Sequence, residues 1–475
     1  SDDDYKAYSP AWQKKYTGID RATIIQIARE FASTAEATKG RCMVISGASS
    51  NHYYHSDLIY RSFIGTLMLT GCVGRNGGGQ NHYVGQERLA PFDSWGQISH
   101  ALDWVRPPRF QNTPSYWYIH TQMFKYDDKL TEYHVVPDKN AIKYQHCADW
   151  QVQAVRLGGL PWYPQLNKSP LVVAEDAQKA GAKTDADIVN YTVKQIKNGG
   201  LQFAVEDPDA PDNWPRVWMI WRGNALGSSA RGHEYFMKFL LGTHHNMDCE
   251  EIAKPYINDM KYRESPLGKL DLIVDLNMRM NTTPTYSDIV LPAAHWYEKE
   301  DINTTDLHSY IHPMGAAVTP NWESKSDWDA FKFIAKKFSE LAEKHFPKPV
   351  KDVVMTPLMH DTPGEITQPA IPDVKDWKKG DCDLIPGVTG PNISVATRDY
   401  ANVYNRYISL GPLMKGKYGF HNIMLDGGPF YKEYMNDAHT QTVEWGGEKY
   451  ISLREAKEAC NAVIFFSIAV QISRP

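Results

Sequence analysis

Short apolar runs and amphipathic stretches alternate through the middle of the chain, a pattern that predicts strands separated by helices. The runs over 217–221, 270–276 and 287–292 have the length of buried strands. A helix is expected near 229–241, and apolar residues that recur every three or four positions predict an amphipathic helix over 327–345. This order of elements is typical of an α/β fold with an open, mostly parallel sheet.

The first part of the chain predicts one more strand–helix unit. Asp20 is a candidate N-cap for a helix through about residue 34, and a short buried strand over 42–46 follows. After a polar turn, a helix is expected over 57–70, with Gly71 just past its end. The turn therefore lies at the carboxyl end of a strand, where ligands bind in open α/β sheets.

The other segments predict less regular structure. Residues 90–200 have the composition of an irregular insertion, and regular structure is expected to begin again with a strand over 202–205. The proline-rich segment 346–400 predicts an extended connector. The apolar run 462–470 is too short for a membrane span, and we expect it to continue a core that lies outside this sequence.

Length, charge and cysteine content narrow the class of protein. A chain of 475 residues is too long for one core and predicts two or three domains. A net charge of −5 without any basic block argues against a nucleic-acid partner. The six cysteines stand far apart without a CxxC pair, so we expect buried thiols and no iron–sulfur cluster within this sequence.

The segment after the first central strand has the chemistry of a phosphate-binding loop. Residues 222–229 (RGNALGSS) include glycines that let backbone N–H groups approach a pyrophosphate, which Arg222 and Asn224 can also bind. Asp275 and Asp288 belong to the next two strands and are candidates for binding a ribose or a guanine edge. The loop lacks the G-x-G-x-x-G pattern, which argues against a nicotinamide dehydrogenase.

Two polar segments in the first part of the chain leave alternatives open. The glycines at 77–79 indicate either a tight turn or a backbone that approaches a cofactor ring, with His82 and Gln86 facing it. His52 and His55 suit local hydrogen bonding or a rim of donors to a cofactor. A zinc pair is disfavoured there, because acidic and cysteine partners are not near in sequence.

Five long runs of residues carry a family resemblance. They are NHYYHSDLIYRS at 51–62, GCVGRNGGGQNHYVGQE at 71–87, WRGNALGSSARGHE at 221–234, YSDIVLPAAHWYEKEDINTTDLHSYIHP at 286–313 and VKDWKKGDCDLIPG at 374–387. The chain resembles, over most of residues 5–415, the catalytic (alpha) subunits of respiratory nitrate reductase and nitrite oxidoreductase. These belong to the dimethyl sulfoxide reductase family of molybdenum enzymes. The resemblance implies that the sequence is a central fragment of such a subunit.

The resemblance implies oxygen-atom transfer between nitrate and nitrite at a molybdenum atom held by two molybdopterin guanine dinucleotides. The cofactor-binding residues that it implies are Gly47, Asn51, His52, Gly79, His82, Arg222, Gly223, Asn224, Leu226, Ser228, Ser229, Asp275, Arg279 and Asp288. It places His52, Val84 and Gln86 on the substrate side of the metal as catalytic residues. It nominates no metal ligand here, because the ligating aspartate and the [4Fe-4S] cluster residues are expected in an N-terminal part outside this sequence.

The resemblance also implies partners: an iron–sulfur beta subunit, a membrane or cytochrome electron-transfer subunit, and a small anion as substrate. We expect membrane association through these subunits, on the cytoplasmic rather than the periplasmic face, with a role in anaerobic respiration or nitrate assimilation. The isolated fragment is expected to be inactive. Alternatives are a nitrite oxidoreductase, a chlorate or perchlorate reductase and, in a different class, a non-catalytic nucleotide-binding fragment.

The resulting domain prediction has four regions. Residues 1–75 would complete one α/β layer, and 76–200 would hold the pterin-contacting glycine-rich segment and the irregular insertion. Residues 201–345 would form the layer that binds the guanine dinucleotide, in a Rossmann-like, doubly wound arrangement. Residues 346–475 would be the extended connector and an incomplete C-terminal region.

Overall fold

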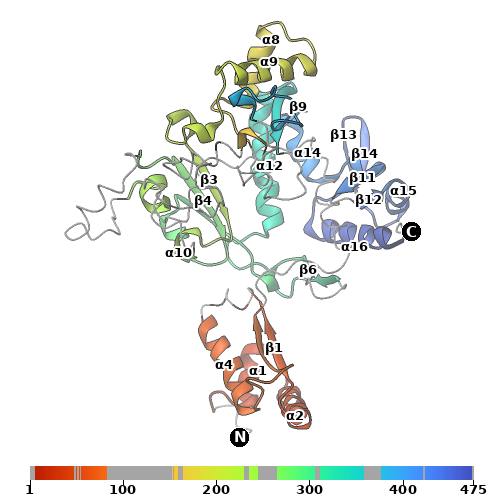
Figure 1. Cartoon of the computed structure of the whole chain (residues 1–475). Helices are drawn as coiled ribbons and strands as arrows, with labels where there is room; N and C mark the ends of the chain where they lie inside the picture. Colours follow the sequence, from red (N-terminus) through yellow and green to blue (C-terminus); the bar gives the residue numbers. More distant parts are fainter. Residues whose placement is uncertain are drawn as a thin grey trace, which may run out of the picture. The chain divides into compact units, whose positions relative to one another are not determined.

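The computed structural model gives the fold as two compact units (Figure 1). One holds Ser1–Ala90 with Thr305–Ser309, and the other holds Pro91–Thr304 with Tyr310–Pro475. Each unit has a hydrophobic core of its own. The residues that the structure describes are 6–47, 50, 53, 55–82, 152, 155–158, 164–228, 235–243, 265–304, 311–357, 376–420 and 423–472.

The first unit contains the strand–helix unit that the sequence predicts. Its elements are α1 (Pro10–Thr17), α2 (Arg21–Ala37), β1 (Met43–Ser46), α4 (Ser56–Leu69) and β2 (Gly79–His82). The two strands pair in parallel, and α4 lies between them in the chain. Ala35, Leu67 and Cys72 form the buried core of this unit. The predicted strand and both predicted helices are therefore confirmed.

Three consecutive glycines bring the chain into β2 past two other backbone segments. A Cβ atom on Gly78 would lie 2.2 Å from the carbonyl oxygen of Gly40 and 2.6 Å from that of Cys72, which is closer than real Cβ atoms come. Gly77 and Gly79 have positive φ angles of 84° and 91°, which glycine adopts without strain. Among the described residues, the close approach at Gly78 is thus to the chain's own backbone.

A three-stranded parallel sheet provides the frame for the loop after Trp221. Its strands are β3 (Val217–Trp221), β4 (Leu272–Asn277) and β5 (Ile289–Pro292), in the order β3-β4-β5. The short helix α10 (Ala225–Ser228) and the π-helix η3 (Tyr235–Leu240) follow β3. Trp218 stacks on Phe236 of η3, with ring centroids 4.8 Å apart. The three predicted strands are confirmed, and the described part of the predicted helix over 229–241 is a π-helix.

The long helix α12 (Asp327–His345) has the bounds that the sequence predicts. It begins after Ser326, whose hydroxyl accepts the Asp329 N–H at 3.1 Å as an N-cap. Its residue Ala330 packs with Leu276 and Ala293 of the sheet layer. The buried positions include Ala330, Ala335, Ser339 and Ala342, whereas Ile334, Phe338 and Leu341 of its apolar face are exposed.

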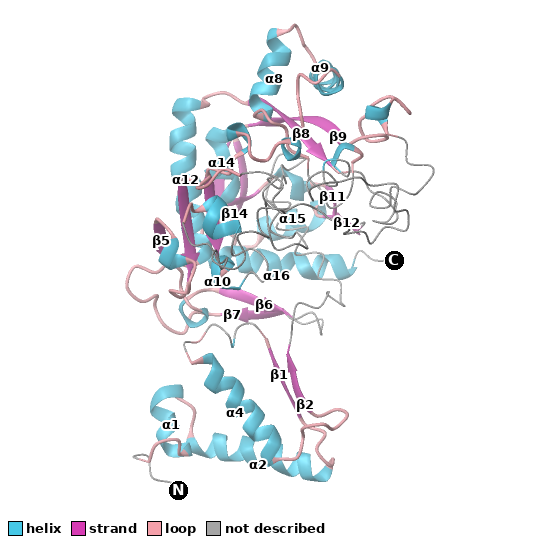
Figure 2. Cartoon of the chain, turned by 60° about the vertical axis from the view of Figure 1, so that its left-hand side comes forward, coloured by secondary structure: helices cyan, strands magenta, loops and turns pink. Residues whose placement is uncertain are grey.

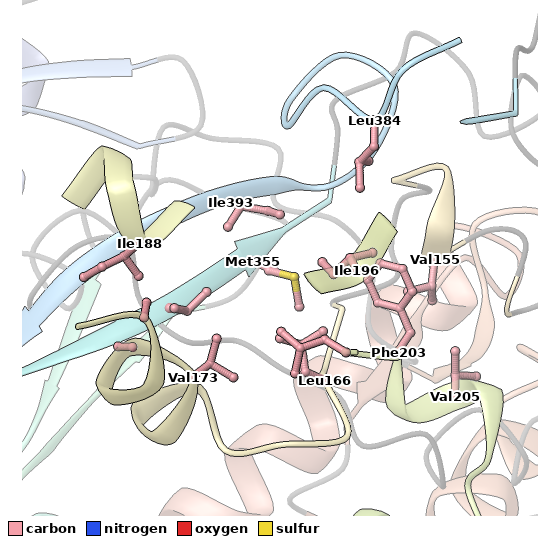
Figure 3. Packing of buried hydrophobic residues seen from close by; sticks show 14 residues of the cluster. Val155, Leu166, Val173, Ile188, Ile196, Phe203, Val205, Met355, Leu384 and Ile393 are labelled. Carbon is pink, nitrogen blue, oxygen red and sulfur yellow. The ribbon is translucent and has the colours of Figure 1, made fainter. Parts of the chain in front are cut away.

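A separate core in the second unit joins segments that are far apart in the sequence. Its elements are α8 (Pro170–Lys179), α9 (Asp185–Lys197), β8 (Val350–Thr356) and β9 (Asn392–Arg398). Figure 3 shows Val173 and Ile188 of the helices packed with Met355 and Ile393 of the antiparallel strand pair. The predictions of an irregular insertion over 90–200 and of an extended connector over 346–400 are wrong where these elements lie.

This core also crosses the domain boundaries expected at 200 and 345, because residues on both sides of each boundary pack into it. The strand predicted over 202–205 is wrong as well. Phe203 makes one isolated bridge to Leu166, and the 3₁₀ turn η1 (Ala204–Glu206) follows at once. Apolar residues alone indicated burial there, but they did not distinguish a strand from a turn.

The C-terminal part of the second unit has its own buried cluster. Its main elements are β10 (Ser409–Leu410), α15 (Gly428–Asn436), β13 (Thr442–Trp445), β14 (Glu448–Ser452) and α16 (Ala456–Ile472). Ala462 and Phe466 of α16 are 1% and 0% exposed and pack with Leu410 and Ile451. The expectation that the run over 462–470 continues an absent core is therefore wrong for these two residues.

Smaller elements connect the larger ones. Figure 2 shows β6 (Asp301–Thr304) and β7 (Ile311–Met314) as an antiparallel pair, and α16 contacts β6. The others are η2 (Pro211–Asn213), η4 (Pro284–Tyr286), η5 (Trp296–Glu298), η6 (Trp377–Lys379), η7 (Tyr400–Asn402), α14 (Val403–Tyr407), η8 (Pro412–Lys415), β11 (Lys417–Phe420) and β12 (Ile423–Asp426). Among the described helices, none is long and apolar enough to cross a membrane.

Gly78→Ala should destabilise the first unit, because its Cβ would overlap two backbone carbonyl oxygens that cannot rotate away. We expect a loss of about 1–3 kcal/mol in the free energy of unfolding, the usual cost of overpacking. Gly65→Ala is the matched control, since a Cβ there meets nothing within 4 Å inside helix α4. The free energy of unfolding of both variants is measured by urea unfolding, with protease cleavage within residues 6–82 as the signal. Equal stability of the two variants would contradict the packing argument.

Candidate functional site

The carboxyl ends of β3, β4 and β5 meet at one edge of the sheet, because the three strands are parallel. The loop over 222–228 leaves β3 at this edge, and the Arg222 N–H donates to the Leu276 carbonyl at 2.9 Å. The segments that follow β4 and β5 start from the same edge. Loops at this position are where ligands bind in open α/β sheets.

Asn224 gives the loop its local conformation. Its Oδ1 accepts the Gly227 N–H at 3.2 Å, and its carbonyl oxygen accepts the Ser228 N–H at 2.8 Å. A Cβ on Gly227 would come within 2.5 Å of the Asn224 amide nitrogen, so glycine is needed for this cap. Leu226 points into a buried apolar cluster with Phe236. The structure therefore brings Gly223, Asn224, Leu226 and Ser228 together at the edge of the sheet, as predicted from the loop; their role in cofactor binding stays a prediction.

Two buried residues that sequence reasoning missed hold this loop to its neighbours. The Thr283 hydroxyl accepts the Leu226 N–H and donates to Asn224 Oδ1, both at 3.1 Å, and the residue is fully buried. The Asn277 amide donates to the Gly223 carbonyl at 3.4 Å, while its oxygen accepts the Arg279 N–H at 3.3 Å. No motif marks either residue. Only their position, at the end of strand β4 for Asn277 and in the segment after it for Thr283, could have suggested them.

Asp327, the first residue of α12, binds the start of the loop. One carboxylate oxygen accepts Trp221 Nε1 at 2.8 Å and Arg222 Nε at 2.9 Å. The other accepts Arg222 Nη2 and Lys299 Nζ, the latter at 2.9 Å. Burial by itself would raise the pKa of Asp327, but the hydrogen bonds from Arg222, Trp221 and Lys299 outweigh it and lower that pKa to about 2.

The indole ring of Trp296 completes this cluster. The Arg222 guanidinium carbon lies 4.8 Å from the ring centroid, and Lys299 Nζ lies 4.5 Å from it. Lys299 also pairs with Asp301 at 2.8 Å. Two cations and two carboxylates therefore meet around one aromatic ring. The sequence suggested that Arg222 neutralises a phosphate; the structure shows it bound to Asp327, and its phosphate role stays a prediction.

Asp275 has the opposite environment. It lies in the central strand β4, level with Ile220 of β3, and its exposed fraction is 0%. Neither of its carboxylate oxygens accepts a hydrogen bond from the described residues. Burial raises the pKa of Asp275, and the Asn277 amide opposes this shift more weakly. Alternate side chains of a strand share a face, so Asp275 lies on the same face as Asn277, which binds the loop.

The structure does not bring Asp288 to the same edge. Asp288 precedes β5, and its carboxylate accepts the Ile273 N–H at 2.8 Å near the amino ends of the strands. Arg279 follows β4, is half-buried, and has an interaction partner of its own. Ser229 lies outside the described residues. The predicted roles of these three residues in cofactor binding stay predictions.

In the first unit, the carboxyl edge of the β1–β2 pair carries two predicted cofactor residues. Gly47 directly follows β1, and its carbonyl accepts the Tyr60 hydroxyl at 3.4 Å. His82 ends β2, level with Ser46. Gly79 lies at the other end of β2, level with Met43. The predicted site residues in this part of the chain that fall outside the described residues are Asn51, His52, Val84 and Gln86.

No group of three or more His, Cys, Asp or Glu side chains within the described ranges could hold a metal ion. The edge of the sheet presents backbone N–H donors, a capped turn and the buried Asp275 carboxylate, whose oxygens accept no hydrogen bond from the described residues. These features suit a polar, phosphate-bearing organic ligand.

Residues 8–337, more than half of the chain, match the family model described as molybdopterin oxidoreductase. The chain belongs to the molybdopterin oxidoreductase family. The α/β fold agrees with this assignment, and membership in the family implies a molybdenum–pterin cofactor. The buried Asp275 carboxylate and the loop over 222–228 are groups that suit such a cofactor, because pterin and nucleotide rings present several N–H donors.

Individual relatives of this molybdopterin oxidoreductase carry more specific names. The respiratory nitrate reductase 1 alpha chain of Escherichia coli is 49% identical over 420 residues, which are 87% of this chain and 33% of that protein. The nitrate reductase alpha chain of Bacillus subtilis is 43% identical over 470 residues, or 98% of this chain and 38% of that protein. The perchlorate reductase subunit alpha of Dechloromonas aromatica is 28% identical over 339 residues. The chain thus spans about a third of the length of these nitrate reductase relatives, 33% and 38%.

Thr283→Val should loosen the loop while keeping the size of the buried side chain. It removes the acceptor of the Leu226 N–H and the donor to Asn224, at an expected cost of about 1–3 kcal/mol for polar groups left buried without partners. Thr282→Val is the control, because that neighbouring residue is exposed. Hydrogen exchange of the amides in 224–228 should be faster only in the Thr283 variant; unchanged protection would show that the bridge does not hold the loop.

Proposed function

We propose that this chain is part of the alpha subunit of a nitrate reductase, an enzyme that interconverts nitrate and nitrite by oxygen-atom transfer. The main support is sequence identity: the chain is 42–49% identical to nitrate reductase alpha chains of several bacteria, but 28% identical to a perchlorate reductase subunit. Nitrate is accordingly favoured over chlorine oxyanions as the substrate. Reduction is favoured over nitrite oxidation because the relatives are named as reductases.

The form of the cofactor in this proposal is molybdopterin guanine dinucleotide. Asp275 supports it, because a fully buried carboxylate whose two oxygens accept no hydrogen bond from the described residues is costly to ionise unless a ligand supplies donors. The Watson–Crick edge of guanine offers two adjacent N–H donors that match the two oxygens of one carboxylate. When bound, the molybdenum cofactor supplies the oxygen-transfer and redox chemistry.

The residues of this chain bind and orient the cofactor in the proposal. Asp275 accepts from the guanine edge, and the capped loop at Asn224 presents its backbone N–H groups to the phosphates. His52, Val84 and Gln86, outside the described residues, are proposed to line the path of the anion. Histidine and amide donors suit a small anion, because they bind it without a full countercharge.

The proposed partners are an iron–sulfur beta subunit and a membrane or cytochrome subunit that delivers electrons. They are supported by the names of the relatives, which are alpha chains and so imply other subunits. We place the [4Fe-4S] cluster and the metal-ligating aspartate in the N-terminal part of the complete alpha subunit. Association with the cytoplasmic face of the membrane through these partners completes the proposal.

The complete alpha subunit, purified with its partners, tests the function. Reduced viologen dye should be oxidised faster with nitrate than with perchlorate or chlorate at equal concentration, with nitrite as the product. A preference for perchlorate would overturn the substrate, and turnover only from nitrite to nitrate with an oxidising dye would overturn the direction. Absence of molybdenum from the purified protein, together with tight binding of free GTP, would support a nucleotide-binding module instead.

Asp275→Asn should lower the content of molybdenum and of guanine nucleotide in the complete enzyme, because one of two acceptors becomes a donor facing the guanine N–H groups. The fold should persist, since the change removes a buried charge without changing size. Asp271→Asn, on an exposed residue just before the same strand, is the matched control. Metal analysis and release of guanine nucleotide on denaturation are the measurements; normal contents in the Asp275 variant would remove it from the guanine site.

A further inference from the structure

The loop after β3 begins with a residue in an unfavourable backbone conformation. Arg222 has a φ angle of 59°, in the left-handed region that costs a side chain with a Cβ roughly 1 kcal/mol or more. The next residue, Gly223, could have absorbed such a turn, yet its φ is not in that region. Something outside the loop must therefore hold Arg222 in place.

The contacts of Arg222 identify what holds it. Two nitrogens of its guanidinium bind both oxygens of Asp327, and its guanidinium carbon lies over the Trp296 ring. A planar guanidinium that binds a carboxylate through two bonds has a fixed orientation, unlike a single ion pair. Asp327 is itself rigid, because it starts the long helix α12 and also binds Trp221 and Lys299.

The charges of this cluster balance internally. Arg222 and Lys299 carry two positive charges, and Asp327 and Asp301 carry two negative charges within direct contact. The side chains of Asp327 and Lys299 are 10% and 2% exposed, so solvent screens their attraction little. A balanced, buried cluster exerts only a weak attraction on a phosphate outside it.

We propose that Asp327 and Lys299 are positioning residues that lock Arg222 in its left-handed conformation, and that Arg222 orients the loop over 223–228 without itself binding the cofactor phosphates. The inference rests on the proposed function only in taking this loop as a cofactor loop. Asp327 and Lys299 act on the loop through Arg222. The hydrogen bond from Thr283 to Asn224 then holds the rest of the loop in the orientation that Arg222 sets.

A double-mutant cycle in the complete alpha subunit tests whether the contact between Arg222 and Asp327 orients the loop. The variants are Arg222→Met, Asp327→Asn and the pair together, with Asp327→Glu as the conservative variant. Arg216→Met with Asp271→Asn is the matched control, because that exposed ion pair joins the residues just before β3 and β4, away from the loop. Two readouts are needed: hydrogen exchange of the amides in 222–228, and molybdenum and pterin content.

Both single variants should speed exchange of the loop amides by about tenfold, the effect of one broken charged contact. The double variant should be no worse than either single one, because both remove the same contact. Asp327→Glu should restore part of the protection, and the control cycle should leave the loop unchanged. Cofactor content should fall by the same factor in the two single variants.

Two results would overturn the proposal. One is unchanged loop exchange in Asp327→Asn. The other is loss of cofactor in Arg222→Met while Asp327→Asn keeps its full content, since Arg222 would then bind the cofactor directly. Exchange is measured equally well in protein produced without molybdate. A wild-type protein that never holds the cofactor would therefore overturn the proposed function, while hydrogen exchange would still test whether Asp327 and Arg222 orient the loop.

Discussion

The carboxylate of Asp327 fixes how the loop after β3 leaves the sheet. It accepts hydrogen bonds from Trp221, Arg222 and Lys299 and thereby joins the end of β3 and the segment after β5 to the start of α12. Removing one partner from such a buried cluster leaves a charge without compensation, which costs more than the pair itself contributes. The direction of the loop over 222–228, and so the site at the sheet edge, depends on this contact.

Two buried aspartates in this unit differ in the hydrogen-bond donors around them, and this difference indicates a structural role for one and a ligand-binding role for the other. Asp327 is surrounded by donors, and its pKa is lowered to about 2. Asp275 is fully buried, neither of its carboxylate oxygens accepts a hydrogen bond from the described residues, and burial raises its pKa against the weaker opposing effect of the Asn277 amide. A carboxylate that is fully satisfied contributes to the fold, whereas an unsatisfied one costs stability and indicates a place for a ligand. The two residues lie in one α/β layer of a molybdopterin oxidoreductase.

The first unit shows a similar division on a smaller scale. Gly78 is required by the chain's own backbone, because three carbonyl oxygens surround the position of its missing Cβ. Gly47 and His82 instead lie at the carboxyl edge of the β1–β2 pair, where parallel strands present their ligand-binding loops. The glycine-rich run resembles a cofactor-binding segment, yet at least one of its glycines, Gly78, is required by the packing of the chain's own backbone.

Sequence by itself predicted the strands over 217–221, 270–276 and 287–292, the helix over 327–345 and the polar, glycine-containing loop over 222–229. Periodicity and capping act over a few neighbouring residues, so a local pattern is sufficient to predict them. Only the tertiary structure decided that α8 and α9 share a core with β8 and β9, that Phe466 of α16 is buried, and that Arg222 binds Asp327. These contacts join residues separated by about a hundred positions or more in most cases, and a local pattern does not encode such pairing because periodicity indicates which residues are buried but not which distant residues they pack against.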